Sequence, residues 1–139
     1  MGLVFPIKSI AGVGNNRTLG ELAPGDQYDS SYIAQPGQVL FSAAYTLTLA
    51  DGNKSIIHPS TDNTARVLTI PSNALVPYPL NTEFWIFNQM NTVTISITAD
   101  TLRLAGGALT GNRTLAVNGV CRAVKVTATI WYIFGWGIT

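Results

Sequence analysis

Apolar and polar side chains alternate along much of this chain, and such alternation over four to eight residues is the pattern of a half-buried β-strand. The pattern is cleanest in residues Thr92–Thr98, where Val93, Ile95 and Ile97 are separated by Thr and Ser. Side chains on a strand point to opposite faces in turn, and β-branched residues suit both faces. We therefore expect a strand here, with its three aliphatic side chains facing a core.

Other segments have the same strand pattern, and turn residues separate them. They are Tyr45–Leu49, Arg66–Ile70, Glu83–Phe87, Leu102–Leu104, Val120–Val126 and Ile130–Gly135. The segment Glu83–Phe87 is almost continuously apolar, which suggests a strand covered on both faces. No segment keeps the helical spacing of apolar residues for three turns. We predict an all-β protein with a β-sandwich or jelly-roll-like single domain.

The first 38 residues differ from the rest, because they are rich in Gly and Pro and show little alternation. Two interpretations stay open for this segment. It could be an arm that packs on a neighbouring subunit, or an irregular first hairpin of the same domain. We therefore divide the chain into an N-terminal arm or irregular segment, residues 1–38, and a β-sandwich domain, residues 39–139. The total of 139 residues is typical of a single domain.

Charge is scarce in this sequence. Charged residues make up 11% of the chain, against roughly 25% in typical soluble domains. The net charge of +1 provides no basic field for nucleic acid. The longest apolar run, Ile130–Trp136, is far shorter than the ~20 residues of a membrane helix. Neither nucleic acid nor a membrane is therefore expected as a partner.

Candidate catalytic groups are few and scattered. His58 is the only histidine and Cys121 the only cysteine, so neither can belong to a cluster of its own kind. We expect His58 to be structural or exposed, and Cys121 to be a small buried apolar residue. The acidic residues stand mostly at expected turns, and no pair of them is singled out. The sequence thus predicts no enzyme activity, no metal and no cofactor.

Residues 58–139 resemble the β-module found in the head-decoration and tail-fibre proteins of tailed bacteriophages. The resemblance is carried by many short pieces rather than by one motif. These pieces are His58–Arg66, Thr69–Asn73, Tyr78–Thr82, Phe87–Gln89, Val93–Ile95, Asp100–Gly106, Gly111–Gly119 and Trp131–Gly137. None of them is a catalytic signature. The sequence departs from the pattern at Cys121, Phe134 and Trp136, and the last two enlarge the apolar surface near the C-terminus.

The resemblance implies a non-enzymatic virion protein. Because tail fibres are usually longer, we expect a capsid decoration or cement protein on the outer surface of the phage head. It would form a homo-oligomer and bridge subunits of the major capsid protein. The alternative is a tail-fibre or tail-tip adhesion module that binds a host surface glycan, for which Trp85, Trp131 and Trp136 are the candidate stacking residues.

The candidate interface consists of aromatic and basic side chains in the C-terminal part of the chain. These residues are Tyr132, Phe134, Trp136, Arg103 and Arg113. The three aromatic residues alternate, so they share one face if the strand continues to the end. We expect Tyr132 and Phe134 to lie mainly in the core, and Trp136 to lie either in the core or at the interface.

Overall fold

The computed structural model describes residues 37–139, and these residues belong to one compact unit. This range contains nine strands and one short 3₁₀ turn, η2 (Leu49–Asp51), and it has no α-helix. The strands are β1 (Gln38–Leu40), β2 (Tyr45–Thr46), β3 (Ser55–His58), β4 (Arg66–Ile70), β5 (Glu83–Asn88), β6 (Val93–Ile97), β7 (Thr101–Leu104), β8 (Arg113–Thr127) and β9 (Ile130–Ile138). The prediction of an all-β domain is confirmed. The predicted N-terminal arm lies almost entirely outside the described residues.

Most of the predicted strands form close to their expected bounds. The segment Arg66–Ile70 is β4 over its whole length, and the strand predicted at residues 92–98 is β6. In β6, Val93 and Ile95 are fully buried, and Ile97 packs against the core while half-buried. The segment Tyr45–Leu49 differs, since only its first two residues form a strand before the chain enters η2.

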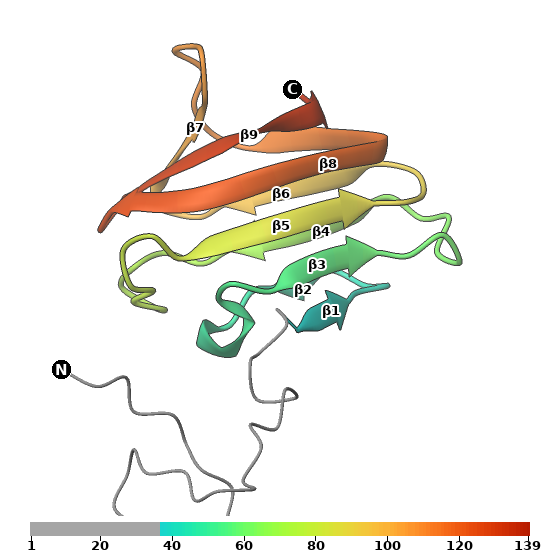
Figure 1. Ribbon diagram of the computed structural model, residues 1–139, viewed down its shortest axis with the longest axis horizontal. Coiled ribbons are helices and arrows are strands. Elements are labelled where there is room, and N and C mark those ends of the chain that lie inside the picture. Colours follow the sequence, from blue (N-terminus) through green and yellow to red (C-terminus); the bar gives the residue numbers. More distant parts are fainter. Residues whose placement is uncertain (1–36) are drawn as a thin grey trace, which may run out of the picture. The chain divides into compact units, whose positions relative to one another are not determined.

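The first six strands are wound as a coil (Figure 1). Each turn of this coil places one strand in a first sheet and the next strand in a second sheet. In the first sheet β1, β3 and β5 pair in parallel, and in the second β2, β4 and β6 do the same. Successive strands therefore lie in opposite sheets, and each chain turn stacks on the one before. The described residues thus form a β-solenoid of about three turns.

This winding differs from the predicted β-sandwich or jelly roll. Those folds pair antiparallel strands through hairpins and Greek-key connections. Here the first six strands make only parallel pairs with one another. Alternation of apolar and polar residues fits both arrangements, because it reports which face of a strand is buried and says nothing of its neighbours.

The long strand β8 closes the coil by crossing from one sheet to the other. Its first part, Arg113–Leu115, pairs antiparallel with β6, and its second part, Val120–Val124, pairs antiparallel with β5. The chain bends between these parts, where Asn118 has φ 59°. Gly119 allows the bend, because a Cβ there would lie 2.6 Å from Leu115 Cδ1 and 2.7 Å from a backbone oxygen.

Strand β9 follows β8 as an antiparallel hairpin, and β7 pairs in parallel with β9. The connection at residues 127–129 is the short hairpin turn that the sequence predicts. The first sheet therefore runs β1-β3-β5-β8-β9-β7. The loop at residues 105–112, between β7 and β8, projects from the sheets (Figure 1).

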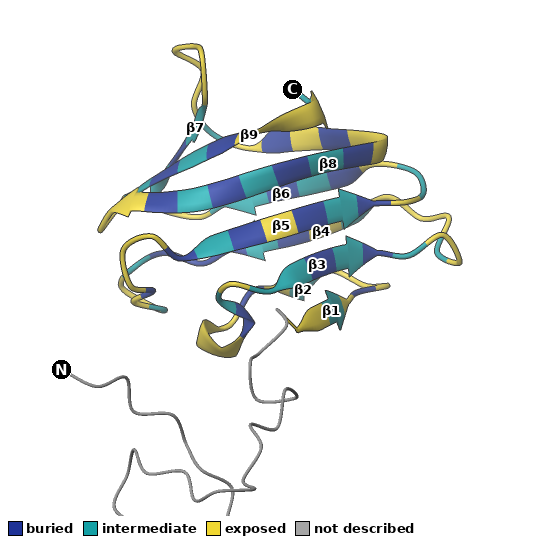
Figure 2. Ribbon diagram, in the orientation of Figure 1, coloured by how far each residue is buried: buried dark blue, intermediate teal, exposed yellow. Residues whose placement is uncertain are grey.

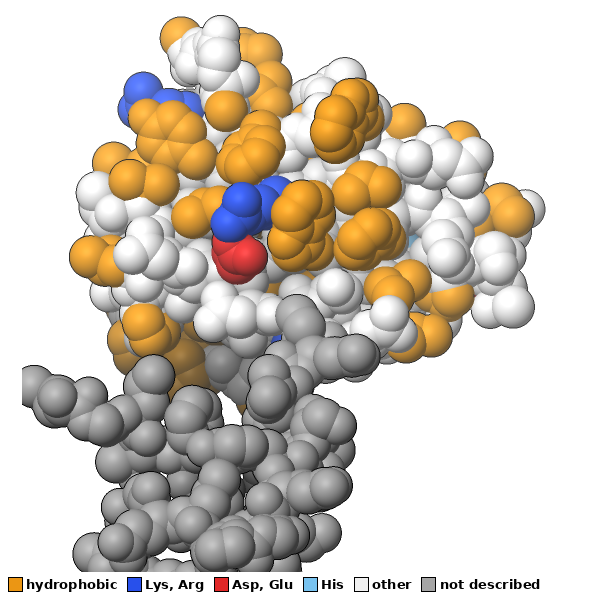
Figure 3. Space-filling view, in the orientation of Figure 1, with side chains coloured by type: hydrophobic (Ala, Val, Ile, Leu, Met, Phe, Trp, Pro, Cys, Tyr) orange, Lys and Arg blue, Asp and Glu red, His pale blue; other side chains and the backbone are white. Residues whose placement is uncertain are grey.

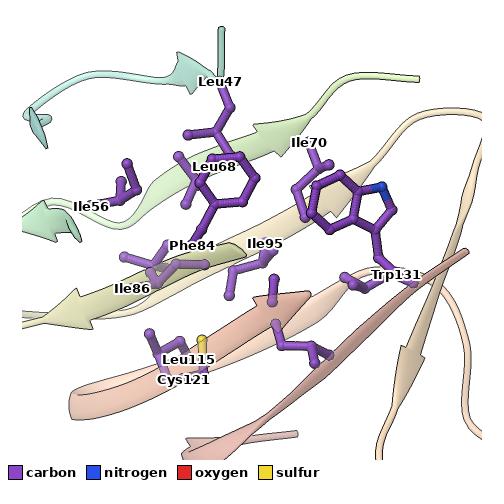
Figure 4. Close-up of a cluster of buried hydrophobic side chains, with 14 of the residues drawn as sticks. Leu47, Ile56, Leu68, Ile70, Phe84, Ile86, Ile95, Leu115, Cys121 and Trp131 are labelled. Carbon is purple, nitrogen blue, oxygen red and sulfur yellow. The ribbon is translucent and has the colours of Figure 1, made fainter. Parts of the chain in front are cut away.

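A core of aliphatic and aromatic side chains fills the space between the two sheets (Figure 4). Both sheets contribute to it, with Ile56 and Ile86 from the first and Leu68 and Ile95 from the second, all fully buried. Buried and more exposed residues alternate along the strands in Figure 2. The period-two pattern of the sequence is thus the inward and outward alternation of the two sheets.

A column of buried side chains lines one corner of the coil, where the chain leaves the first sheet for the second. His58 and Asn88 are paired neighbours in this column, and Phe41 packs 5.4 Å from the imidazole. The amide nitrogen of Asn88 donates to the carbonyl oxygens of Asn91, Leu115 and Ala116 at 2.8, 3.1 and 2.9 Å. One buried side chain therefore ties the third turn of the coil to β8.

Candidate functional site

The outer face of the first sheet carries an unusual concentration of aromatic and aliphatic side chains. We call this surface the aromatic face. It consists of Glu83, Trp85 and Phe87 of β5, Val120, Arg122 and Val124 of β8, Tyr132, Phe134 and Trp136 of β9, and Arg103 of β7. In Figure 3, which is viewed from this side, apolar side chains gather around one adjoining basic and acidic pair.

Strand pairing arranges these residues in three rows across the sheet. One row is Phe87, Val120 and Trp136, and the next is Trp85, Arg122 and Phe134. The third row is Glu83, Val124, Tyr132 and Arg103. Cross-strand neighbours in such rows are 4.5–5.5 Å apart at Cβ. The aromatic face is therefore a continuous surface rather than a set of isolated apolar residues.

Three side chains of the aromatic face are well exposed. The exposed fractions are 79% for Trp136, 41% for Phe134 and 39% for Trp85. Single exposed apolar residues are ordinary, but a contiguous patch of them marks an interaction surface. The expectation from the sequence is that Glu83–Phe87 is covered on both faces. That expectation is wrong for the outer face, because Trp85 is exposed there within the described residues.

The structure also corrects the expected placement of two aromatic residues. Tyr132 is half-buried and Phe134 exposed, whereas the core positions of β9 are filled by Trp131 and Ile133, both fully buried. The segment is apolar at every position from Ile130 to Phe134, so its sequence carries no alternation to show which residues face inward. Register with β8 decides it, because Ile133 pairs with the inward-facing Ala123.

Two guanidinium groups lie over aromatic rings of this face. The Arg122 Cζ atom is 5.5 Å from the centroid of Trp85, and the Arg103 Cζ atom is 5.8 Å from that of Tyr132. Arg122 also pairs with the carboxylate of Glu83. Among the described residues, Arg103 has no acidic partner within salt-bridge distance. The face therefore combines apolar surface with one ion pair and one surplus positive charge.

The fifth predicted interface residue, Arg113, does not lie on the aromatic face. It belongs to the part of β8 that pairs with β6, and only 9% of it is exposed. Its guanidinium donates to the carbonyl oxygens of Thr110 and Gly111 at 2.7 and 3.1 Å. Arg113 thus holds the base of the projecting loop. The sequence could not separate it from Arg103, since that depends on which face of each strand is inward.

The lone histidine is part of a buried hydrogen-bond cluster at the corner. Its Nδ1 atom lies 2.8 Å from Asn88 Oδ1, and its Nε2 atom lies 3.1 Å from Asp62 Oδ2. Asn88 donates its amide hydrogens elsewhere, so Nδ1 is the donor in the first bond. Hydrogen bonds from Arg66 outweigh desolvation and hold the pKa of Asp62 well below its usual range.

The histidine cluster links neighbouring turns of the coil. His58 is fully buried, and its two ring nitrogens lie within hydrogen-bond distance of Asn88 and Asp62. His58 is buried rather than exposed, and its structural role stays a prediction. Among residues 37–139, no group of three or more His, Cys, Asp or Glu side chains could hold a metal ion.

A second buried polar cluster surrounds Lys125, and none of the predictions from the sequence included it. Only 1% of Lys125 is exposed, and its Nζ atom donates to Asn73 Oδ1 at 2.5 Å and to the Tyr78 carbonyl at 2.8 Å. The ammonium also lies 5.8 Å from the Trp131 ring centroid. Burial lowers the pKa of Lys125. Lys125 stands two and four residues after Ala123 and Cys121, so it shares their face of the strand. The expected burial of Cys121 was the signal that could have indicated the burial of Lys125.

Cys121 is buried in the core, as predicted from the sequence. Burial alone raises the pKa of its thiol to about 12. A thiol with so high a pKa is scarcely ionised near neutral pH, and the thiolate is the reactive form. Cys121 therefore packs as a small apolar residue.

No family model, curated protein or solved structure matches the chain. Within residues 37–139, no helix is long and apolar enough to span a lipid bilayer. The contiguous exposed side chains of the aromatic face make it the candidate functional site, and its chemistry is that of a binding surface.

Proposed function

We propose that this chain is a non-enzymatic phage structural protein that decorates and cements the capsid. The observation that carries the proposal is the exposed aromatic face of the first sheet. The resemblance of the sequence of residues 58–139 to phage decoration and tail-fibre modules supports the same assignment. A virion protein is held by several neighbours, and it can bury between subunits an apolar surface that a free monomer would leave exposed.

The composition of the aromatic face fits protein contacts. Trp, Tyr and Arg are the residues most enriched at interface hot spots, and the face contains all three. Trp136 is its most exposed aromatic residue, so it would bury the most new surface on binding. A protein that binds only the assembled shell stabilises that shell by mass action. Homo-oligomerisation and binding to the major capsid protein would both use such surfaces.

Quantitative mass spectrometry of purified particles tests the proposal directly. A copy number in the hundreds is expected for a decoration protein, and a handful of copies would contradict it. Trp136→Ala should lower the occupancy of the particle at least tenfold and lower its heat resistance. Leu75→Ala is a matched control, because Leu75 is 75% exposed but lies outside the aromatic face. It should leave occupancy unchanged.

The second candidate is an adhesion module that binds a host surface glycan. The exposed Trp136 ring favours it, since sugar rings stack on exposed aromatic faces. Two observations weaken it. Arg122 already covers one face of Trp85, and Trp131 is fully buried and cannot stack on a glycan. Binding on a glycan array that is lost in Trp136→Ala would favour this function over capsid decoration.

A further inference from the structure

The third row of the aromatic face has an acidic residue at one end and a basic residue at the other. It runs from Glu83 on β5 through Val124 and Tyr132 to Arg103 on β7. Three strand spacings of about 4.8 Å separate the two ends, so Glu83 and Arg103 stand roughly 14 Å apart. They are too distant to pair within one copy of the chain.

We propose that the aromatic face binds the same face of a second copy around a twofold axis. The axis runs parallel to the strands, between β8 and β9. This inference rests on the self-association part of the proposed function and adds the surface and the symmetry. Rotation about such an axis keeps every row in register and exchanges its two ends. Glu83 of one copy then lies opposite Arg103 of the other, and the contact occurs twice.

The other two rows are also complementary under this rotation. Arg122 on β8 comes opposite Phe134 on β9 of the second copy, which is a cation–π pairing. In the remaining row, Val120 comes opposite Trp136 of the second copy. Sheets that stack face to face lie about 10 Å apart, which is enough for such side chains to interdigitate. Trp136 would then be covered close to the axis.

The charged groups of one copy are ready to accept these new contacts. Glu83 uses Oε2 to bind Arg122, and the described residues offer no hydrogen-bond donor to its other carboxylate oxygen. Arg103 lies over Tyr132 without an acidic partner in that part of the chain. Pairing of Glu83 with Arg103 across the axis supplies each group with an opposite charge. A second copy therefore matches the face both in charge and in the order of residues along each row.

Exchange of the two charges tests this symmetry with the full chain. Arg103→Glu places two acidic residues opposite each other in its own dimer, and Glu83→Lys places two basic residues there. A mixture of the two variants restores both pairs in the heterodimer. We expect a dimer for the unmodified chain in sedimentation and native mass measurements. Each variant alone should raise the dissociation constant at least about tenfold, and the mixture should return to within about threefold of the original value.

Two further variants keep the test decisive. Val67→Glu adds a charge at an exposed position of β4 in the second sheet, and it should leave dimerisation unchanged. Glu83→Gln serves if Glu83→Lys fails to fold, which circular dichroism would show. Its mixture with Arg103→Glu keeps one restored pair and should still dimerise more tightly than Arg103→Glu alone.

The outcomes separate this inference from the proposed function. A monomeric chain, or a mixture of variants that does not recover, overturns the twofold pairing. A monomer that still occupies particles in hundreds of copies overturns the pairing and supports capsid decoration, with the aromatic face then bound to another protein. A dimer with the expected charge exchange that is absent from particles supports the pairing and overturns the decoration function. Glycan binding by a monomer overturns both.

Discussion

Removal of the Asn88 side chain should destabilise the protein far more than removal of an exposed polar side chain. Its amide nitrogen faces three carbonyl oxygens at 2.8–3.1 Å, and its Oδ1 atom accepts from the buried His58 ring at 2.8 Å. In Asn88→Ala these groups lose their partner in a place where water cannot readily replace it. The bonds to Leu115 and to His58 are fully buried.

The expected magnitude follows from these two buried bonds. A buried group left without a hydrogen-bond partner costs about 1–3 kcal/mol. Two such groups, with smaller losses at the partly buried bonds, give a loss of about 3–5 kcal/mol in the free energy of unfolding. Domains are usually stable by only about 5–15 kcal/mol, so the variant should lose a large fraction of its stability.

Equilibrium unfolding in guanidinium chloride measures this loss. Asn63→Ala is the matched control, because Asn63 only accepts exposed hydrogen bonds from Asn91 and should change stability by less than about 0.5 kcal/mol. Asn88→Asp keeps the shape but turns the donor toward the carbonyl oxygens into an acceptor. It should cost at least as much as Asn88→Ala at neutral pH. A loss below about 1 kcal/mol in either Asn88 variant would refute the reasoning.

Three further predictions concern single residues. Gly135→Ala should lower the free energy of unfolding by more than about 2 kcal/mol, because Gly135 has φ 153° and a Cβ there would lie 2.5 Å from a backbone Cα of β8. The control is Gly107→Ala, which has ordinary space around it and should be nearly neutral. Thermal melts measure both variants. Burial raises the pKa of Asp51, but hydrogen bonds from Thr48 outweigh burial and lower that pKa overall. The ionised Asp51 side chain therefore stabilises the fold above the pKa of the unfolded chain, about 3.9. This stabilisation is lost as the pH falls through the lower pKa of the folded protein. Stability measured from pH 5 to pH 2 should therefore decline less in Asp51→Asn than in the unmodified chain. Cys121 should not react with a thiol reagent at pH 8 in the folded protein and should react fully in denaturant, and rapid labelling of the native state would contradict its burial.

The position of many strands could be predicted from the sequence, because alternation is a local property. It placed β4 and β6 within a residue or two of their bounds, and it identified Val93 and Ile95 as inward-facing. The burial of Cys121 followed from its chemistry.

Pairing between strands could not be predicted in this way. Strands β3 and β5 are neighbours although 24 residues separate the end of one from the start of the other, and nothing in either segment encodes the other. The solenoid therefore could not be separated from a sandwich. The same limit explains Lys125, whose charge suggests a surface position until Asn73 and Tyr78 are brought beside it.

The sequence by itself determined that this protein is a β-domain with little charge and an apolar C-terminal segment. Only the tertiary structure decided that Trp131 belongs to the core and Trp136 to the surface. The reason is physical, because a continuous apolar run has no preferred inward face until its strand is paired in register. Pairing of β9 with β8 and β7 selects that face, and it also gathers Arg103, Arg122 and the aromatic side chains into one surface.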